Sequence, residues 1–534
     1  MKNKLLISAV TFLAGAVILS SCAKKLDIIP SNAFSSSQVY SSPESFKQVL
    51  GKLYATLSTT GNTGPAGSPD IGGGLDEGSQ ISLIRGFFNC QELPTDEAVV
   101  AWNDQTIWDF HYLRWNSADP FLKGIYARPI YNISLANELL RNSTDAKLSE
   151  YGISGNDATI VKNMRSEARF LRAFNYWIML DLFGKSTFVT ENDPVSNFIP
   201  PEISRTNLFN YIETELKAID SELPAERTAE YGRVDKAAAW GLLARLYLNA
   251  GVYTGTTRYN DAITYAKKVI NAGYTLNNDY RKMFQADNNI TSKNEFIFVA
   301  PCDGLTGKSY GNTTFLIHAP AGADYRDFGA NNGWFGYRST AAFAALWPDL
   351  TGTTDKRAMF QTSAFNATMS QAQINDISDF SNGLHVNKHR NIRSDGAPVN
   401  DPNSEFSDID FPFIRLAEMY FIYAESVLRG GTGGDATTAL GYINALRTRA
   451  GATTISSGSL NLQFILDERA RELYWEGHRR TDLVRYGLLT TGTYLWPWKG
   501  GVASGTAVDA KYNIFPVPVA NLNSNRNLTQ NTGY

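Results

Sequence analysis

Apolar residues recur at three- and four-residue spacing in several separate blocks of this chain, which predicts amphipathic helices. The blocks are residues 161–183, 235–250, 260–272, 413–429, 435–450, 463–476 and 482–486. The blocks 235–250 and 260–272 are each followed by a glycine, Gly251 and Gly273, which predicts where these helices end. Together they predict an antiparallel hairpin with small residues at the seam, and Trp240 on its core face. Such hairpins are typical of tetratricopeptide units, although the strict repeat consensus is absent.

Helical periodicity is missing from two long stretches, roughly residues 60–118 and 295–405. Glycine, asparagine, threonine, proline and single aromatic residues dominate both stretches. Long irregular segments inside a compact chain are usually functional insertions. The sequence therefore predicts a mainly α fold, with paired helices resembling tetratricopeptide repeats and large irregular loop insertions. We expect one compact unit over residues 43–534.

The N-terminus carries two lysines and then an apolar run over residues 5–19, too short to span a bilayer in the mature protein. Two serines and Cys22 follow directly, and Leu-Ser-Ser-Cys resembles the bacterial lipobox. This arrangement predicts a signal peptide over 1–21, a lipid anchor on Cys22 and a polar tether over 22–42. The alternative is an ordinary secretory signal with an incidental cysteine.

The amino-acid composition limits the classes of function that the protein can have. The net charge is −3 and charged residues make up 19% of the chain, which argues against nucleic-acid binding. Aromatic residues make up 12%, with 10 tryptophans, and there are 43 glycines. Long loops that carry flat apolar rings suit sugar binding, and they also suit a loop-rich enzyme. Whether Cys90 and Cys302 pair is left open.

Three motifs have residue types that are found in chemical sites. Residues 304–309 look like a phosphate-binding loop, but the required first glycine falls on Cys302 and no strand-then-helix pattern flanks them. His385 and His389 are four residues apart in a polar, non-helical segment, which argues against a zinc site. The charged segment 467–480 predicts ion pairs at helical spacing with a structural role.

Carboxylates cluster at Glu92, Asp96 and Glu97, beside Trp102. A glycoside hydrolase needs two carboxylates flanking a sugar, and aromatic walls commonly line such sites. A surface hydrolase is therefore the alternative enzyme class. The competing interpretation is that Asp96 and Glu97 cap a turn or helix after the preceding proline.

Several segments resemble the SusD/RagB family. They are residues 413–425, 468–485 and the ending 515–534, with Phe-Pro-Val-Pro near its start. The resemblance implies a fold of paired tetratricopeptide-like helices with the ligand site on loops, and no catalysis. It also implies a lipid-anchored protein at the cell surface of the outer membrane. Family members bind oligosaccharides there and cap a SusC-like TonB-dependent transporter.

Residues 88–97, 332–334, 393–396 and 494–501 resemble the starch-binding founder of that family. The resemblance implies an arc of three aromatic residues that holds an α-glucan oligosaccharide. Matched motif by motif, the arc falls on Trp102, Tyr310 and Trp334. The implied polar partners are Arg85, Asn103, Asp104 and Gln105, with Gln105 replacing an asparagine of the founder. The chain also looks shorter than the founder between Trp334 and residue 393.

The physical chemistry supports such an arc. A glucose ring has one apolar C–H face that packs on an indole or phenol, while its hydroxyl groups need polar partners. A curved α-1,4-glucan suits an arc, whereas a flat β-1,4 chain suits a plane. No cofactor is required. The same resemblance implies a structural calcium ion, with Asp287, Asn289, Asp408 and Asp410 as oxygen ligands.

Overall fold

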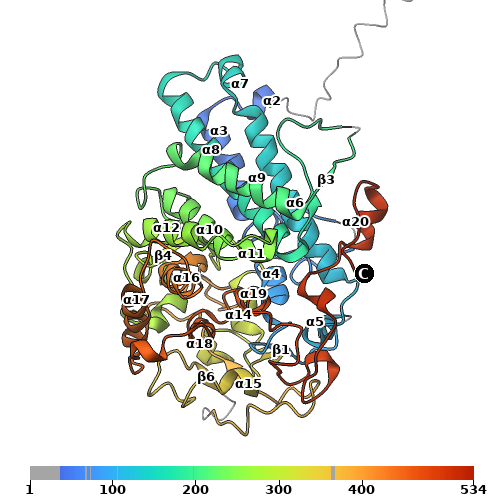
Figure 1. Ribbon diagram of the computed structural model, residues 1–534. Coiled ribbons are helices and arrows are strands. Elements are labelled where there is room, and N and C mark those ends of the chain that lie inside the picture. The colour runs from blue at the N-terminus through green and yellow to red at the C-terminus, as the bar shows by residue number, and fades with distance from the viewer. Residues whose placement is uncertain (1–35, 66–68, 73, 105, 197, 362–366) are drawn as a thin grey trace, which may run out of the picture.

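The computed structural model describes residues 36–65, 69–72, 74–104, 106–196, 198–361 and 367–534 (Figure 1). The predicted signal peptide, Cys22 and the tether up to residue 35 lie outside the described residues. None of the described helices is both long and apolar enough to cross a membrane.

Helices form the body of the described chain, and the strands are short. The α-helices are α2 (Ser36–Val39), α3 (Pro43–Ala55), α4 (Leu83–Glu92), α5 (Ile107–Tyr112), α6 (Pro120–Asn142), α7 (Asp145–Glu150), α8 (Gly155–Phe183), α9 (Arg205–Ala218), α10 (Lys236–Leu248), α11 (Ala250–Thr254), α12 (Tyr259–Ile270), α13 (Asn288–Thr291), α14 (Thr313–His318), α15 (Ala341–Ala344), α16 (Leu416–Leu428), α17 (Ala436–Ala450), α18 (Leu462–Leu473), α19 (Arg479–Arg485) and α20 (Val519–Ser524). The strands form antiparallel pairs: β1 (Val99–Val100) with β5 (Tyr337–Arg338), β2 (Ser186–Thr187) with β3 (Glu202–Ile203), β4 (Phe296–Ala300) with β8 (Phe411–Arg415), and β6 (Phe360–Gln361) with β7 (His385–Val386).

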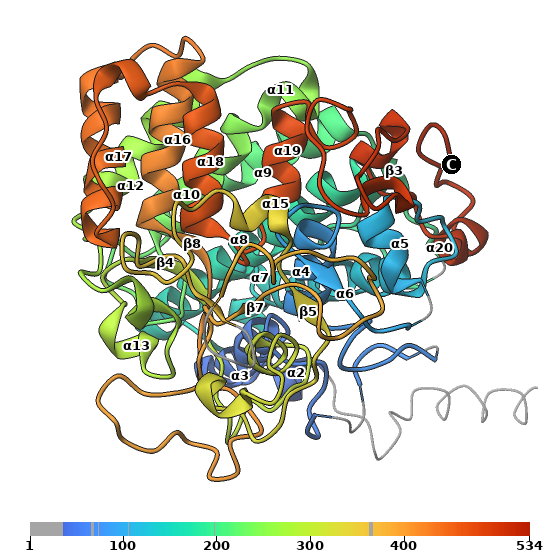
Figure 2. The same cartoon turned by 90° about the horizontal axis from the view of Figure 1, so that it is seen from below.

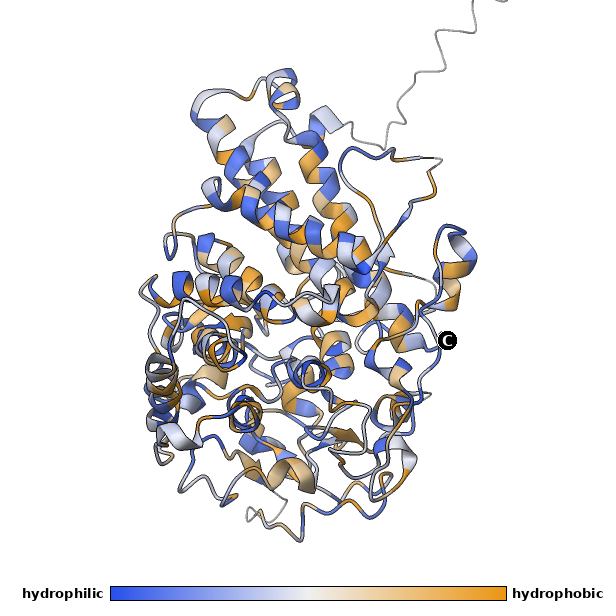
Figure 3. Ribbon diagram, in the orientation of Figure 1, coloured by the Kyte–Doolittle hydropathy of each residue, from blue (hydrophilic) through white to orange (hydrophobic). Residues whose placement is uncertain are grey.

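The helices pack in successive neighbouring pairs, as the apolar blocks predicted. Helix α8 packs against α6 and α9, α10 against α12, and α16 against both α12 and α17 (Figures 1 and 2). Figure 3 shows apolar and polar residues alternating around these helices. Their apolar faces join one continuous core that runs from Tyr40 to Leu528. The prediction of a mainly α fold with tetratricopeptide-like helix pairs is confirmed.

The hairpin of α10 and α12 shows how the sequence sets these elements. Asp235 caps α10 by accepting hydrogen bonds from the backbone N–H groups of the first helical turn. A side chain at Gly241 would lie 2.9 Å from Ile414 of β8, so α10 needs a small residue where it packs against the β4–β8 pair. The prediction that Gly251 ends the helix is wrong, because the chain turns into α11 there. The short helix α11 ends instead at Gly255, whose φ of +77° suits glycine.

Trp240 is not a core residue, contrary to the prediction. Its side chain is only partly buried, the indole N–H donates a hydrogen bond to Asp220, and Lys268 Nζ lies 5.2 Å from the ring centroid. Helix α10 is apolar on nearly every side, so its periodicity could not show which residue faces outward.

Two other boundaries differ from the prediction. The stretch 60–118 contains α4 and α5. Every residue of α4 is buried, including its polar ones, so no alternation between apolar and polar positions marks it as a helix. Residues 411–415 form β8 instead of the start of α16, because they pair with β4. The stretch 295–405 is largely irregular, as predicted, with only short helices and strands.

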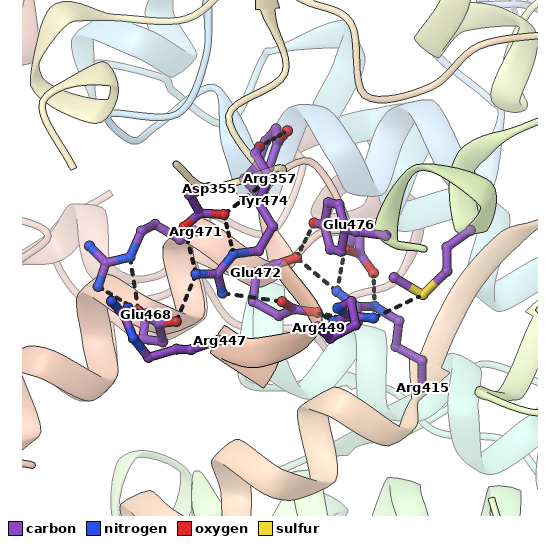
Figure 4. A network of polar contacts seen from close by, with 12 residues as sticks. Asp355, Arg357, Arg415, Arg447, Arg449, Glu468, Arg471, Glu472, Tyr474 and Glu476 are labelled. Atoms are coloured by element: carbon purple, nitrogen blue, oxygen red, sulfur yellow. Dashed lines mark hydrogen bonds and ion pairs between the residues drawn. The ribbon is translucent and has the colours of Figure 1, made fainter. Parts of the chain in front are cut away.

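A buried ion-pair network joins the segments that carry the family resemblance (Figure 4). Arg415, at the end of β8, pairs with Glu472 at 2.8 Å and with Glu476 at 2.6 Å, and these side chains are at most 1% exposed. Further pairs surround them: Arg415–Glu295, Arg449–Glu295, Arg357–Glu468 and Lys388–Glu476. Burial opposes ionisation of Glu472, but three arginines outweigh it and lower its pKa to about 2. The predicted structural role of segment 467–480 is confirmed.

Candidate functional site

Three of the predicted site residues lie together on the irregular side of the molecule. Strand β1 leads directly to Trp102, and its partner β5 follows Trp334. The backbone N–H of Ala101 donates to the carbonyl of Gly336 at 2.8 Å, and the Trp102 indole N–H donates to the carbonyl of Trp334 at 2.9 Å. Residues that are more than 200 positions apart in the chain are thereby fixed against each other.

Gly336 allows the close approach of these two segments. A Cβ atom at this position would lie 2.0 Å from Trp102 Cε2, which no side chain could tolerate without movement of the indole. The Asn-Asn-Gly-Trp-Phe-Gly segment therefore needs its second glycine to seat Trp102.

Tyr310, Trp334 and Trp102 form a row, here called the aromatic row. The ring centroids of Tyr310 and Trp334 are 6.2 Å apart, and those of Trp334 and Trp102 are 6.3 Å apart. The ring planes are tilted by 56° and 51° at these two steps, so the row is bent instead of flat. All three side chains are partly buried, with part of each ring accessible. The row is a bent series of apolar faces.

Tyr310 and Trp334 are held in place by contacts outside the row. The Tyr310 hydroxyl donates to Glu405 at 2.6 Å, and the Trp334 indole stacks on His318 with centroids 4.9 Å apart and planes 18° apart. His318 is itself fixed by hydrogen bonds to two backbone carbonyls, those of Asn332 and Glu405. The rings are therefore preorganised, which lowers the entropic cost of binding a ligand on them.

Arg85, from the buried helix α4, lies close to two rings of the row. Its guanidinium carbon lies 5.6 Å from the Trp102 ring centroid, 6.0 Å from that of Trp334 and 4.6 Å from that of Phe315. The residue is 8% exposed, and burial lowers the pKa of its guanidinium. No ion pair joins it to another described residue, so the group has hydrogen-bonding capacity left for a polar ligand.

A hollow of about 430 Å³ opens beside the row. It is lined by Arg85, Trp102, Asn103, Asp104, Trp334 and Phe380. Asn103 and Asp104 are exposed at its edge, while Gln105 lies outside the described residues. The hollow combines aromatic faces with a cation, an amide and a carboxylate, which are the groups that bind a neutral sugar. Phe380 was not predicted, because a single phenylalanine in a polar segment carries no pattern.

The carboxylates proposed for a hydrolase do not line this hollow. Glu92, Asp96 and Glu97 are at most 2% exposed. Asp96 forms an ion pair with Arg479 at 2.8 Å, and Glu92 accepts a hydrogen bond from the backbone N–H of Gly477. Burial raises the pKa of Glu92 to about 7 and also raises that of Glu97, helped by the charge of Glu92. These acids anchor segment 468–485 and are buried away from the hollow.

The predicted calcium ligands do not form a cation cage. Both carboxylate oxygens of Asp287, Asp408 and Asp410 already accept hydrogen bonds from N–H or O–H groups of the protein. Asn289 is exposed. Among the described residues, no group of three or more His, Cys, Asp or Glu side chains could hold a metal ion. Calcium prefers six to eight converging oxygens, so these residues do not fit it and instead fasten loops.

Neither the two cysteines nor the histidines at four-residue spacing form a shared site. Cys90 and Cys302 are both buried and both free, so they do not pair. His385 contacts Asp324 at 3.0 Å, whereas His389 packs against Phe284, so the two histidines do not share a ligand.

Comparison with known proteins agrees with this picture. The SusD family model matches residues 244–534. The chain is 38% identical to the starch-binding protein SusD of Bacteroides thetaiotaomicron over 97% of this chain and 96% of that protein. A SusD-like protein of Bacteroides ovatus is 24% identical over 91% of this chain and 83% of its own length.

Solved structures share the fold. Surface glycan-binding protein A from Bacteroides fluxus superposes with a TM-score of 0.68 at 19% identity and covers 92% of this chain and 99% of its own. A laminarin-binding SusD-like protein gives a TM-score of 0.68 at 19% identity, with the same coverage of both chains. At this identity the likeness establishes the fold alone. From the family match and the full-length relative, together with the helix pairs already described, the chain belongs to the SusD family of glycan-binding proteins.

Proposed function

We propose that this protein is a cell-surface lipoprotein that captures starch-type α-glucan oligosaccharides and delivers them to a SusC-like TonB-dependent transporter. The observation that carries the proposal is the bend of the aromatic row, whose successive rings turn by 56° and 51°. A helically curved α-1,4-glucan can lay one sugar face on each ring of such a row. The relative at 38% identity is named a starch-binding protein, which supports the same ligand class.

The expected affinity is modest. Each sugar face that covers an aromatic ring removes about 100 Å² of apolar surface from water, worth roughly 2.5 kcal/mol before the cost of ordering the chain. Arg85, Asn103 and Asp104 add hydrogen bonds to hydroxyl groups, which mainly fix the position of the sugar. Binding in the micromolar to millimolar range suits a protein that must release its ligand to a transporter.

The ligand class is tested by isothermal titration calorimetry with maltoheptaose, laminarihexaose and cellohexaose. We expect measurable binding of maltoheptaose and at least about tenfold weaker binding of the two β-linked chains, because they cannot follow the bend of the row. Preference for laminarihexaose would redirect the proposal to a β-1,3-glucan, the ligand class named for one structural neighbour.

The protein is expected to release no reducing sugar from starch or maltooligosaccharides over many hours. The hollow contains a single carboxylate among its described lining residues, Asp104, whereas hydrolysis of a glycosidic bond usually needs two. A reducing-end assay with an amylase as positive control makes the measurement. Turnover that persists in repurified protein and disappears in Asp104→Asn would contradict the binding-only proposal.

Replacing the predicted lipid-bearing cysteine, in Cys22→Ala, is expected to yield a folded protein that partitions into the aqueous phase. None of the described helices could cross a membrane, and we expect attachment to depend on the acyl chains. Detergent-phase partitioning of wild type and variant makes the comparison. A variant that stays in the detergent phase would exclude Cys22 as the anchor.

A further inference from the structure

Phe380 is an exposed aromatic residue without a packing role. Its side chain is 43% exposed, and it belongs to none of the apolar clusters of the described chain. An isolated exposed phenylalanine is unremarkable by itself. Phe380, however, lines the same hollow as Trp102 and Trp334 of the aromatic row.

The turn that carries Phe380 is firmly held. The buried guanidinium of Arg338 donates hydrogen bonds to the backbone carbonyls of Ile377 at 2.9 Å and Asn382 at 2.7 Å, and also to that of Asp379. The Asn382 side-chain oxygen accepts the backbone N–H of Asn375 at 2.8 Å, which closes the turn.

Arg338 also fixes this turn relative to the aromatic row. It is the last residue of β5, which pairs with β1 immediately before Trp102. The backbone of the turn is therefore fixed, so only the side-chain torsions of Phe380 need to be ordered when a ligand covers the ring. The fold therefore holds an exposed aromatic ring at this position, although the ring does not contribute to the core.

We infer that Phe380 is a fourth stacking platform, which extends the site for α-glucan chains longer than three glucose units. This inference rests on the proposed function. Tyr310 contacts Trp334 but does not line the hollow, so a ligand that touches both Tyr310 and Phe380 must run along the row and into the hollow. A short oligosaccharide contacts only the rings of the row, whereas a longer one also stacks on Phe380. Phe380 thus sets a preference for chain length.

The test is calorimetry of wild type, Phe380→Ala and Phe380→Trp with maltotriose and maltoheptaose. For maltoheptaose we expect Phe380→Ala to raise the Kd about five- to tenfold, the lower part of the range for loss of one stacking ring. For maltotriose the Kd should stay within about twofold, because that ligand covers the three rings of the row and does not extend to Phe380. Phe380→Trp should keep maltoheptaose binding at or above the wild-type level, because an indole provides the same stacking face.

Leu495→Ala is the matched control, because Leu495 is 40% exposed and does not line the hollow. It should bind both sugars as wild type does, and the melting temperatures of all variants should agree. If Phe380→Ala weakens both sugars equally, or neither, the inference is overturned while the proposed function stands. If the wild type binds neither sugar, the proposed function itself fails.

Discussion

Arg415→Ala is expected to lower the free energy of unfolding by about 3–5 kcal/mol, the range for breaking a buried ion pair from one side. Arg415 is 1% exposed and contacts Glu295, Glu472 and Glu476. Its removal leaves these carboxylates buried without their shared counter-charge. Urea denaturation at pH 7, followed by tryptophan fluorescence, measures the change. Arg393→Ala is the control, because Arg393 pairs with Asp395 at the surface, where such a pair contributes about 0–1 kcal/mol.

The network also predicts the response of wild-type stability to acid. The folded-state pKa of Glu472, about 2, lies below its ordinary value of 4.5. A depressed pKa contributes stability that is present above the unfolded-state pKa and is lost as the pH falls toward the folded one. The contribution should therefore disappear between about pH 4.5 and pH 2. If Arg415→Ala unfolds at the same urea concentration as Arg393→Ala, the ion-pair network around Arg415 does not stabilise the fold.

Much of the fold could be predicted because most of its helices are half-buried. The blocks that became α12 and α17 alternate between apolar and polar positions, and this alternation is visible in sequence alone. Helix α4 is buried on every side, so its polar residues fall among apolar ones without a period. Helix α10 is likewise apolar on nearly every side, so its sequence could not show that Trp240 faces outward.

The site was only partly predictable. Its three row residues were found through resemblance, since no local pattern distinguishes Trp102 or Trp334 from the buried Trp115. Phe380 gave no signal, because its position depends on hydrogen bonds from Arg338, more than 40 residues away for the Asn382 carbonyl. The carboxylates near Trp102 gave a misleading signal, because in sequence they resemble the acids of a glycoside hydrolase. Their burial depends on Arg479 and Gly477, which lie about 380 positions further along the chain.

Trp334→Ala is expected to weaken maltoheptaose binding by about 1–3 kcal/mol, or roughly 5- to 150-fold in Kd. Trp334 is the middle ring of the row, in contact with both Tyr310 and Trp102, so its loss divides the stacking surface in two. Trp102→Ala should cost at least as much, because it also removes the hydrogen bond that fixes the Trp334 carbonyl. Trp334→Tyr should recover part of the affinity, since it restores an aromatic face at the same place.

The decisive comparison is with a tryptophan of the core. Trp177 on α8 is 2% exposed, and Trp177→Ala should destabilise the fold by about 3–5 kcal/mol through the cavity it leaves. Its folded fraction should bind maltoheptaose normally, because Trp177 lies in the helical core outside the hollow. Trp334→Ala should show the reverse, with binding lost and the melting temperature changed little, since its side chain is only partly buried. Normal binding by Trp334→Ala together with early melting would mean that the row packs a loop, and that the glycan binds elsewhere.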